Sequence, residues 1–156
     1  MEGNLMKNNR GFSLLELLIV VAIILIIATI AIPSLLRSRQ AANESAAVSD
    51  LRTINTAEVT YLSSAGGNYG DLPNLVTAGL LDARFSAATL SGYQFVVTAS
   101  GSDYTATATP TSTNSGRYGY FAYPDAVIRY QSATSGTCNP CFPTIGGSSM
   151  AGAPVQ

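Results

Sequence analysis

The sequence predicts an α+β fold in which one long N-terminal helix packs on a small antiparallel sheet of about four strands. Three observations predict this class. Residues 14–36 are almost continuously apolar, and residues 37–65 repeat apolar side chains at helical spacing. The pair Gly66-Gly67 ends the helical pattern, and several segments beyond residue 92 alternate apolar and polar side chains as strands do.

The apolar segment is long enough to cross a membrane. As a helix, Leu14 to Leu36 would span about 34 Å at 1.5 Å per residue, and a hydrocarbon core is about 30 Å thick. Lys7 and Arg10 precede the segment, so we expect its N-terminal side to stay in the cytoplasm and the rest to be exported.

One carboxylate, Glu16, interrupts this segment near its start. A charge at the centre of a bilayer costs roughly 2.5–3.5 kcal/mol on insertion scales, so a charge kept there usually has a partner. Glu16 also argues against an ordinary secretory signal peptide, and no small-x-small cleavage site follows before Pro33. A plain signal anchor stays open on these grounds.

The first third of the chain contains a specific motif. It consists of Gly11-Phe12-Ser13-Leu14-Leu15-Glu16-Leu17, the apolar run after it, and the closing Ile30-Ala31-Ile32-Pro33. With this motif the chain resembles a type IV pilin, and the same signature marks the pseudopilins of type II secretion. The resemblance implies that a prepilin peptidase cuts between Gly11 and Phe12. It also implies that Phe12 is then N-methylated and that residues 1–11 are a leader absent from the mature protein.

Such processing would give Glu16 its partner. The cut creates a cationic amine on Phe12, about one helical turn before Glu16. In a filament of packed helices, Glu16 would enter an apolar bundle, where the Phe12 amine of a neighbouring copy could pair with it. Removing one partner of a buried pair typically costs about 3–5 kcal/mol, so we expect this pair to set the register between subunits.

Relatives commonly carry a glycine midway along the apolar run, where this chain has Leu25. In the family, the stretch between that glycine and the proline can lose helicity on assembly. Here Pro33 alone breaks the hydrogen-bond ladder, by depriving the Thr29 carbonyl of its donor. We therefore expect a kink at Pro33 rather than a melted segment.

Residues 37–65 form the amphipathic half of the same helix, which would run for about 50 residues. Its apolar face combines Ala47, Leu51, Ile54, Tyr61, Leu62 and Ala65. Glu58 falls near the centre of this face. It could be a second buried carboxylate with an arginine partner, or it could reach water because the face is shallow there. We favour the second interpretation.

Residues 66–131 are expected to form a globular α+β head. A short helix is expected at Leu72–Leu80, closed by Gly79. Two strand pairs are expected after it, and the turn Tyr123-Pro124-Asp125 joins the second pair. The expected strands are 93–99, 104–109, 118–122 and 126–130.

The tail, residues 132–156, is rich in Ser, Gly, Thr and Pro and holds both cysteines, Cys138 and Cys141. Two cysteines in an exported domain most often form a disulfide, here a local clip with a very small ring. A redox-active pair needs a helix N-terminus, for which the sequence gives no signal. Zinc needs two further ligands, which subunits would have to share.

Composition argues against catalysis and nucleic-acid binding. The chain has no His and carries net charge −1, and removal of residues 1–11 would take away Lys7, its single lysine. A weakly acidic surface is a poor nucleic-acid binder, and we expect Arg117 and Arg129 to be solvated at strand ends. The acids of the head are expected at turns or caps; they are Asp71, Asp82, Asp103 and Asp125. We expect no enzyme activity, no metal and no cofactor.

These observations and the resemblance favour a structural pilin subunit that polymerises through its N-terminal helix into a type IV pilus. The expected partners are copies of itself in a helical filament, the prepilin peptidase, the inner-membrane pilus assembly machinery and, before assembly, the membrane. The precursor would be a single-pass protein of a bacterial inner membrane with a periplasmic C-terminus, and the assembled pilus would be extracellular. One alternative is a pseudopilin of type II secretion. Major pseudopilins often carry an acidic calcium site near the C-terminus, and residues 131–156 contain no Asp or Glu, which disfavours this alternative. The other alternative is a signal-anchored periplasmic enzyme or binding protein. Adhesion, motility, DNA uptake and electron conduction are all known uses of such filaments.

Overall fold

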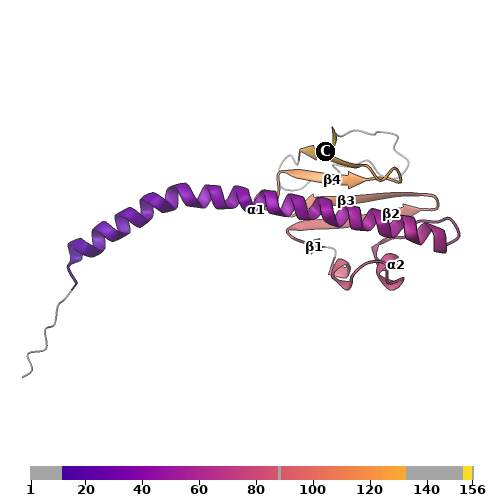
Figure 1. The fold of residues 1–156 in the computed structure, drawn as a ribbon, viewed down its shortest axis with the longest axis horizontal. Coiled ribbons are helices and arrows are strands. Elements are labelled where there is room, and N and C mark those ends of the chain that lie inside the picture. The colour runs from indigo at the N-terminus through magenta and orange to yellow at the C-terminus, as the bar shows by residue number, and fades with distance from the viewer. Residues whose placement is uncertain (1–11, 88, 133–152, 156) are drawn as a thin grey trace, which may run out of the picture. The chain divides into compact units, whose positions relative to one another are not determined.

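The computed structural model describes residues 12–87, 89–132 and 153–155 of the chain. The chain divides into two units, residues 1–36 and residues 37–156. One helix, α1 (Leu14–Ser64), contributes to both units (Figure 1). The α+β class predicted from the sequence is confirmed.

In the first unit, α1 begins directly after Ser13. The Ser13 carbonyl accepts hydrogen bonds from the backbone N–H groups of Glu16 and Leu17, with N–O distances of 3.1 and 3.2 Å. Within the described residues, α1 is the one helix long and apolar enough to cross a membrane, judged by its length and composition. The helix contains Pro33 and continues on both sides of it.

In the second unit, α1 ends at Ser64, as the glycine pair predicts. Gly66 and Gly67 adopt positive φ angles of 67° and 87°. The N–H of Gly67 donates to the carbonyl of Leu62 at 3.0 Å. This bond satisfies one of the carbonyls left open at a helix end, in the manner of a Schellman cap.

The short helix after this turn is α2 (Leu72–Thr77), which ends earlier than the predicted Leu80. Asp71 caps its N-terminus by accepting the N–H of Asn74 at 3.1 Å. Gly79 adopts φ +71°, and the N–H of Leu80 donates back to the Leu75 carbonyl at 3.0 Å. Gly79 therefore closes the helix as expected, but the turn that contains it is no longer α-helical. A 3₁₀ helix, η1 (Ala83–Ala87), follows.

The sheet has six strands in sequential order, and every neighbouring pair is antiparallel. The strands are β1 (Thr89–Leu90), β2 (Tyr93–Ser100), β3 (Asp103–Pro110), β4 (Tyr118–Ala122), β5 (Ile128–Ser132) and β6 (Ala153–Pro154). The four longer strands correspond to the four predicted ones. The additional strands, β1 and β6, have two residues each, too few to show an alternating pattern.

One strand begins later than the sequence predicts. We expected a strand from Ala126, but β5 begins at Ile128. Ala126 has a φ of 58°, and its N–H donates to the Tyr123 carbonyl at 2.9 Å. The side chain of Asp125 also accepts the N–H of Val127 at 3.0 Å. Residues 123–127 therefore belong to the turn, because both N–H groups bond within it and not to β4.

The core of the second unit lies between one face of the sheet and residues 37–64 of α1 (Figure 1). From α1 it includes Ala47, Leu51, Ile54 and Ala57, and from β2 it includes Tyr93, Phe95 and Val97. Leu51 and Ile54 are completely buried. Of the predicted apolar face of residues 37–65, Ala47, Leu51, Ile54 and the partly buried Tyr61 pack in this core. Leu62 and Ala65 are half-buried and are not part of the core cluster.

Candidate functional site

The first candidate site is the apolar surface of α1 between residues 14 and 36. All its large apolar side chains are exposed, from Leu14, which is 79% exposed, to Leu36 at 37%. Monomeric soluble proteins rarely expose a contiguous apolar patch of more than a few hundred Å². A surface of this kind must be covered by lipid or by other protein.

Glu16 lies on this surface and is exposed, as is Phe12. Within the described residues, the carboxylate of Glu16 forms no hydrogen bond and no ion pair. Gly11 lies outside the described residues, so the structure describes only Phe12 of the predicted cleavage junction. The predicted roles of Glu16 and Phe12 in assembly, and the predicted kink at Pro33, stay predictions.

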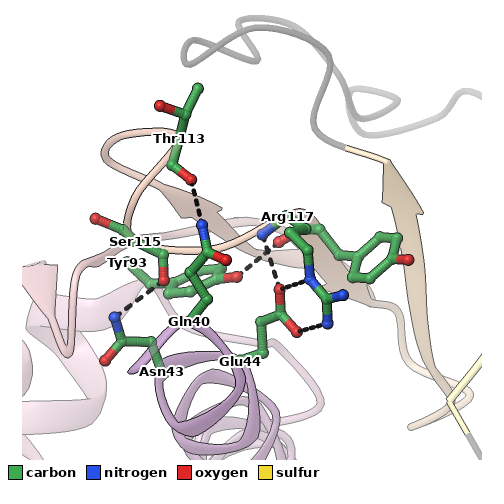
Figure 2. Close-up of polar contacts among 8 residues, drawn as sticks. Gln40, Asn43, Glu44, Tyr93, Thr113, Ser115 and Arg117 are labelled. Atoms are coloured by element: carbon green, nitrogen blue, oxygen red, sulfur yellow. Dashed lines mark hydrogen bonds and ion pairs between the residues drawn. The ribbon is translucent and has the colours of Figure 1, made fainter. Parts of the chain in front are cut away.

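A second group of polar contacts ties α1 to the loop between β3 and β4 (Figure 2). Gln40 donates from Nε2 to the Thr113 carbonyl at 2.7 Å, and Asn43 donates from Nδ2 to the Ser115 carbonyl at 2.9 Å. Gln40, Asn43 and Glu44 have the spacing i, i+3, i+4, which places them on one side of a helix. These contacts hold the β3–β4 loop against residues 40–44 of α1.

Glu44 makes the strongest of these contacts. Its Oε1 accepts the backbone N–H of Arg117 at 2.8 Å and the Nε–H at 3.2 Å, and its Oε2 accepts from Nη2 at 3.0 Å. Glu44 is 7% exposed, whereas the Arg117 side chain is 59% exposed. Figure 2 shows the guanidinium reaching across the two carboxylate oxygens. A bidentate pair of this kind specifies one arrangement of loop and helix.

Two further ion pairs connect segments of the head. Asp50 of α1 accepts a hydrogen bond from Nη2 of Arg84 at 2.7 Å. Burial raises the pKa of Asp50 from its ordinary value, and the Arg84 charge opposes that rise. Asp125 accepts from Nη2 of Arg129 at 2.7 Å, and this pair lowers the pKa of Asp125.

The expectation of solvated arginines at strand ends is wrong for Arg129, and it is incomplete for Arg117, whose side chain is exposed but ion-paired. Arg117 and Arg129 are both ion-paired, and the Arg129 side chain is only 11% exposed. Sequence reasoning also missed Glu44 and Asp50. The available signal was their position three residues before and after Ala47, which places both acids beside the predicted apolar face.

Glu58 fits neither interpretation offered by the sequence. It is completely buried, so it does not reach water, and its hydrogen-bond partner among the described residues is a backbone group instead of an arginine. Burial raises its pKa to about 7; the N–H of Gly70 lowers the pKa and the charge of Asp71 raises it further. Gly70, in the loop after α1, supplies this contact, which the pattern of residues 37–65 could not indicate.

Three of the four acids predicted at caps or turns form the hydrogen bonds expected of such positions. Asp71 caps α2, Asp82 accepts the N–H of Arg84 at 2.8 Å, and Asp125 lies in the β4–β5 turn. Cys138 and Cys141 lie outside the described residues. Among the residues that are described, no group of three or more His, Cys, Asp or Glu side chains could hold a metal ion.

Comparison with known proteins bears on the first site. The model of the prokaryotic N-terminal methylation motif matches residues 6–32. The type IV major pilin protein PilA of Myxococcus xanthus is 42% identical over 66 residues, which are 42% of this chain and 30% of the relative. The type IV wide pilus major component PilA4 of Thermus thermophilus is 36% identical over 75 residues, 48% of this chain and 57% of the relative.

The chain carries the prokaryotic N-terminal methylation motif and is similar over part of its length to two major components of type IV pili. The match to the motif covers Phe12, Glu16 and most of the apolar segment, so the resemblance seen in the sequence is confirmed. The chain spans less than two thirds of either pilin relative. No solved structure matches it.

Proposed function

We propose that the protein is a structural pilin subunit that polymerises through residues 14–36 of α1 into a type IV pilus. The observation that carries this proposal is the wholly exposed apolar surface of that segment on a chain with the N-terminal methylation motif. Both relatives are named as components of type IV pili, which supports a pilus over a pseudopilus.

The energetics suit a surface that is first in lipid and later between copies of the chain. Inside a bilayer, lipid tails cover the apolar side chains. Once a subunit leaves the bilayer, other copies must replace the lipid. Burial of about 400 Å² per neighbour at about 25 cal/mol per Å² contributes roughly 10 kcal/mol, before the entropy of association is subtracted.

Glu16 and Phe12 supply register in this proposal. Prepilin peptidase cuts between Gly11 and Phe12, and the new N-methylated amine of Phe12 pairs with Glu16 of a neighbouring copy. The exposure of both residues and the lack of a Glu16 partner within the described chain support this arrangement. Apolar packing alone tolerates slippage between helices, whereas a buried charge pair does not.

In the same proposal, the precursor spans the inner membrane once with a periplasmic C-terminus, and the pilus machinery assembles it into an extracellular filament. The subunit has a structural role and needs no cofactor. We also propose that Cys138 and Cys141 form a disulfide in the exported tail. Alkylation of the purified, unreduced protein should leave both thiols unlabelled, and labelling without prior reduction would contradict the disulfide.

The test of the proposed function is made in cells that carry a prepilin peptidase and a pilus assembly system. Intact mass of the mature protein should show a chain that begins at N-methylated Phe12, and shearing should release the protein from the cell surface. A mature chain that begins elsewhere would contradict the assignment. Retention of a processed chain in the periplasm after shearing would favour the pseudopilin alternative.

Glu16→Val tests the register pair. The variant should insert into the membrane and be processed, but the sheared fraction should lose most of the protein. Thr29→Val is the matched control, because Thr29 is an exposed polar residue of the same segment whose hydroxyl bonds only the Ile26 carbonyl in the described structure. It should assemble as the wild type does. Normal assembly of Glu16→Val would refute the role of Glu16.

A further inference from the structure

Some charged side chains of the head form ion pairs within one chain, and others do not. Every charged side chain after residue 11 lies in the described residues. Three ion pairs form among them, and each joins an acid to an arginine. The pairs are Glu44–Arg117, Asp50–Arg84 and Asp125–Arg129.

The arginines outside these pairs all lie on α1. Arg37, Arg39 and Arg52 are exposed, and none forms a hydrogen bond or an ion pair from its side chain within residues 12–87, 89–132 and 153–155. Arg37 and Arg39 stand at the very start of the second unit, directly after the apolar segment. They make this end of the head basic.

The acids of the head that are neither buried nor paired with an arginine belong to segments other than α1. They are Asp71, Asp82 and Asp103. Asp71 and Asp103 come from neighbouring segments, because the N–H of Tyr69 donates to the Gly101 carbonyl at 2.9 Å and the rings of Tyr69 and Tyr104 are 4.6 Å apart. These two aspartates form an acidic end of the head.

The acidic end lies beside α1 at the level of Asn55 and Glu58. The hydroxyl of Tyr104 donates to Oδ1 of Asn55 at 2.9 Å, and the N–H of Gly70 donates to Oε2 of Glu58 at 3.1 Å. This level is about 25–30 Å along the helix from Arg37 and Arg39, at 1.5 Å per residue. That separation exceeds the screening length of about 8 Å, so the two ends cannot neutralise each other within one chain.

We propose that Arg37 and Arg39 of one copy bind Asp71 and Asp103 of a second copy that is shifted along the helix axis by about 25–30 Å. The proposal rests on the proposed function, since it needs copies packed side by side and in parallel. A neighbour without the shift would place arginines beside arginines and aspartates beside aspartates. Like charges repel, so these charges favour the shifted arrangement and disfavour the unshifted one.

The test uses charge reversal and rescue in the assembling cells. Arg37→Glu with Arg39→Glu should be inserted and processed normally, but should lower the yield of sheared filaments about tenfold or more. Asp103→Arg should lower the yield as well, and Asp103 suits this change because its side chain forms no hydrogen bond within the described residues. Combining all three changes restores opposite charges at position 103, while Asp71 stays acidic, so the triple variant should recover part of the yield lost by the double variant.

Arg52→Glu is the matched control. Arg52 is an exposed and unpaired arginine of the same helix, but it lies well beyond the basic end. Its reversal should leave the yield within about twofold of the wild type. Thermal unfolding of each variant in detergent should match the wild type, so that a lost filament can be assigned to assembly.

The outcomes separate this inference from the proposed function. Absence of filaments from the wild-type chain would refute the proposed function itself. Normal filaments from the Arg37→Glu, Arg39→Glu variant, or no recovery in the triple variant, would overturn the charge pairing and leave the proposed function intact. Failure of the double variant to enter the membrane would also overturn it, because the arginines would then serve anionic lipid headgroups.

Discussion

Oε2 of Glu58 accepts a hydrogen bond from the backbone N–H of Gly70 at 3.1 Å, while Oε1 of the same buried carboxylate has no partner among the described residues. The bond joins the last turns of α1 to the loop that leads into α2. An ionised carboxylate with one unsatisfied oxygen in a core is costly. This arrangement therefore makes the stability of the head depend on the protonation of Glu58.

The first prediction is that the head loses stability as pH rises from about 5 to 7. Burial raises the pKa of Glu58 from 4.5 to about 7, so the folded chain binds this proton more tightly than the unfolded chain. The stabilisation is fully present below the unfolded pKa and is lost as pH passes the folded pKa. It amounts to about 3 kcal/mol. Thermal unfolding of the full chain in detergent across this range measures it.

Glu58→Gln identifies the group responsible. The amide keeps an acceptor for the N–H of Gly70 and carries no charge at any of these pH values, so most of the pH dependence should disappear. Asp50→Asn is the comparison, because burial also raises the pKa of Asp50. The Asp50→Asn variant should remove a smaller part of the pH dependence than Glu58→Gln does. An unchanged slope in Glu58→Gln would show that Glu58 does not control the stability.

The environment of Glu58 could be predicted from the sequence only in part. The spacing of apolar residues placed it correctly on the buried face and located α1, and the pair Gly66-Gly67 predicted where that helix ends. The pattern could not show that Gly70 folds back over the carboxylate, since that contact depends on the path of a loop. The partner of a buried acid is fixed by tertiary structure, and here it is a backbone N–H.

The arginine partners illustrate the same limit. A buried acid with an arginine was the right kind of contact, but the structure forms it at Glu44 and Asp50. Glu44 and Arg117 are 73 positions apart, and Asp50 and Arg84 are 34 apart. Pairing at these separations follows from how helix and sheet pack. Strands with alternating side chains were predictable, whereas the two-residue strands β1 and β6 exist only through pairing with β2 and β5.

The second prediction concerns the two sides of the Glu44–Arg117 pair. Arg117→Ala should destabilise the head more than Glu44→Gln does, because it leaves a nearly buried carboxylate without its cation. Glu44→Gln should cost about 1 kcal/mol, since it keeps an acceptor for the Arg117 N–H and leaves an exposed guanidinium in water. Denaturant unfolding of both single variants and the double variant measures this order. Equal losses, or the reverse order, would argue against it.

The third prediction concerns Gly116, which is buried between β3 and β4. A Cβ at this position would collide with Oη of Tyr93 and would lie 2.6 Å from its Cζ. Tyr93 is itself completely buried, and its hydroxyl donates to the Tyr118 carbonyl at 2.8 Å, so the ring cannot move aside without losing that bond. Gly116→Ala should therefore lower the free energy of unfolding by about 1–3 kcal/mol.

Asn114→Ala is the control for Gly116→Ala. Asn114 is exposed in the same loop, and its substitution should change the free energy of unfolding by no more than about 0.5 kcal/mol. Denaturant midpoints of the two variants give the comparison directly. A Gly116→Ala variant as stable as the wild type would mean that Tyr93 can shift, and the loop would then be less tightly fixed than its contacts with α1 indicate.

The fourth prediction concerns Pro33. Proline has no N–H, so the Thr29 carbonyl lacks its α-helical donor, and the ring crowds that carbonyl. We expect a local weakness of α1 there, with a kink as its structural form. Pro33→Ala supplies the donor and should slow amide exchange in the turn after residue 33 by roughly tenfold or more in detergent micelles. Ile32→Ala is the control, because it changes an exposed neighbour and leaves the ladder intact. Equal exchange in Pro33→Ala and wild type would mean that the helix is as firm at Pro33 as elsewhere, and the expected kink would lose its physical basis.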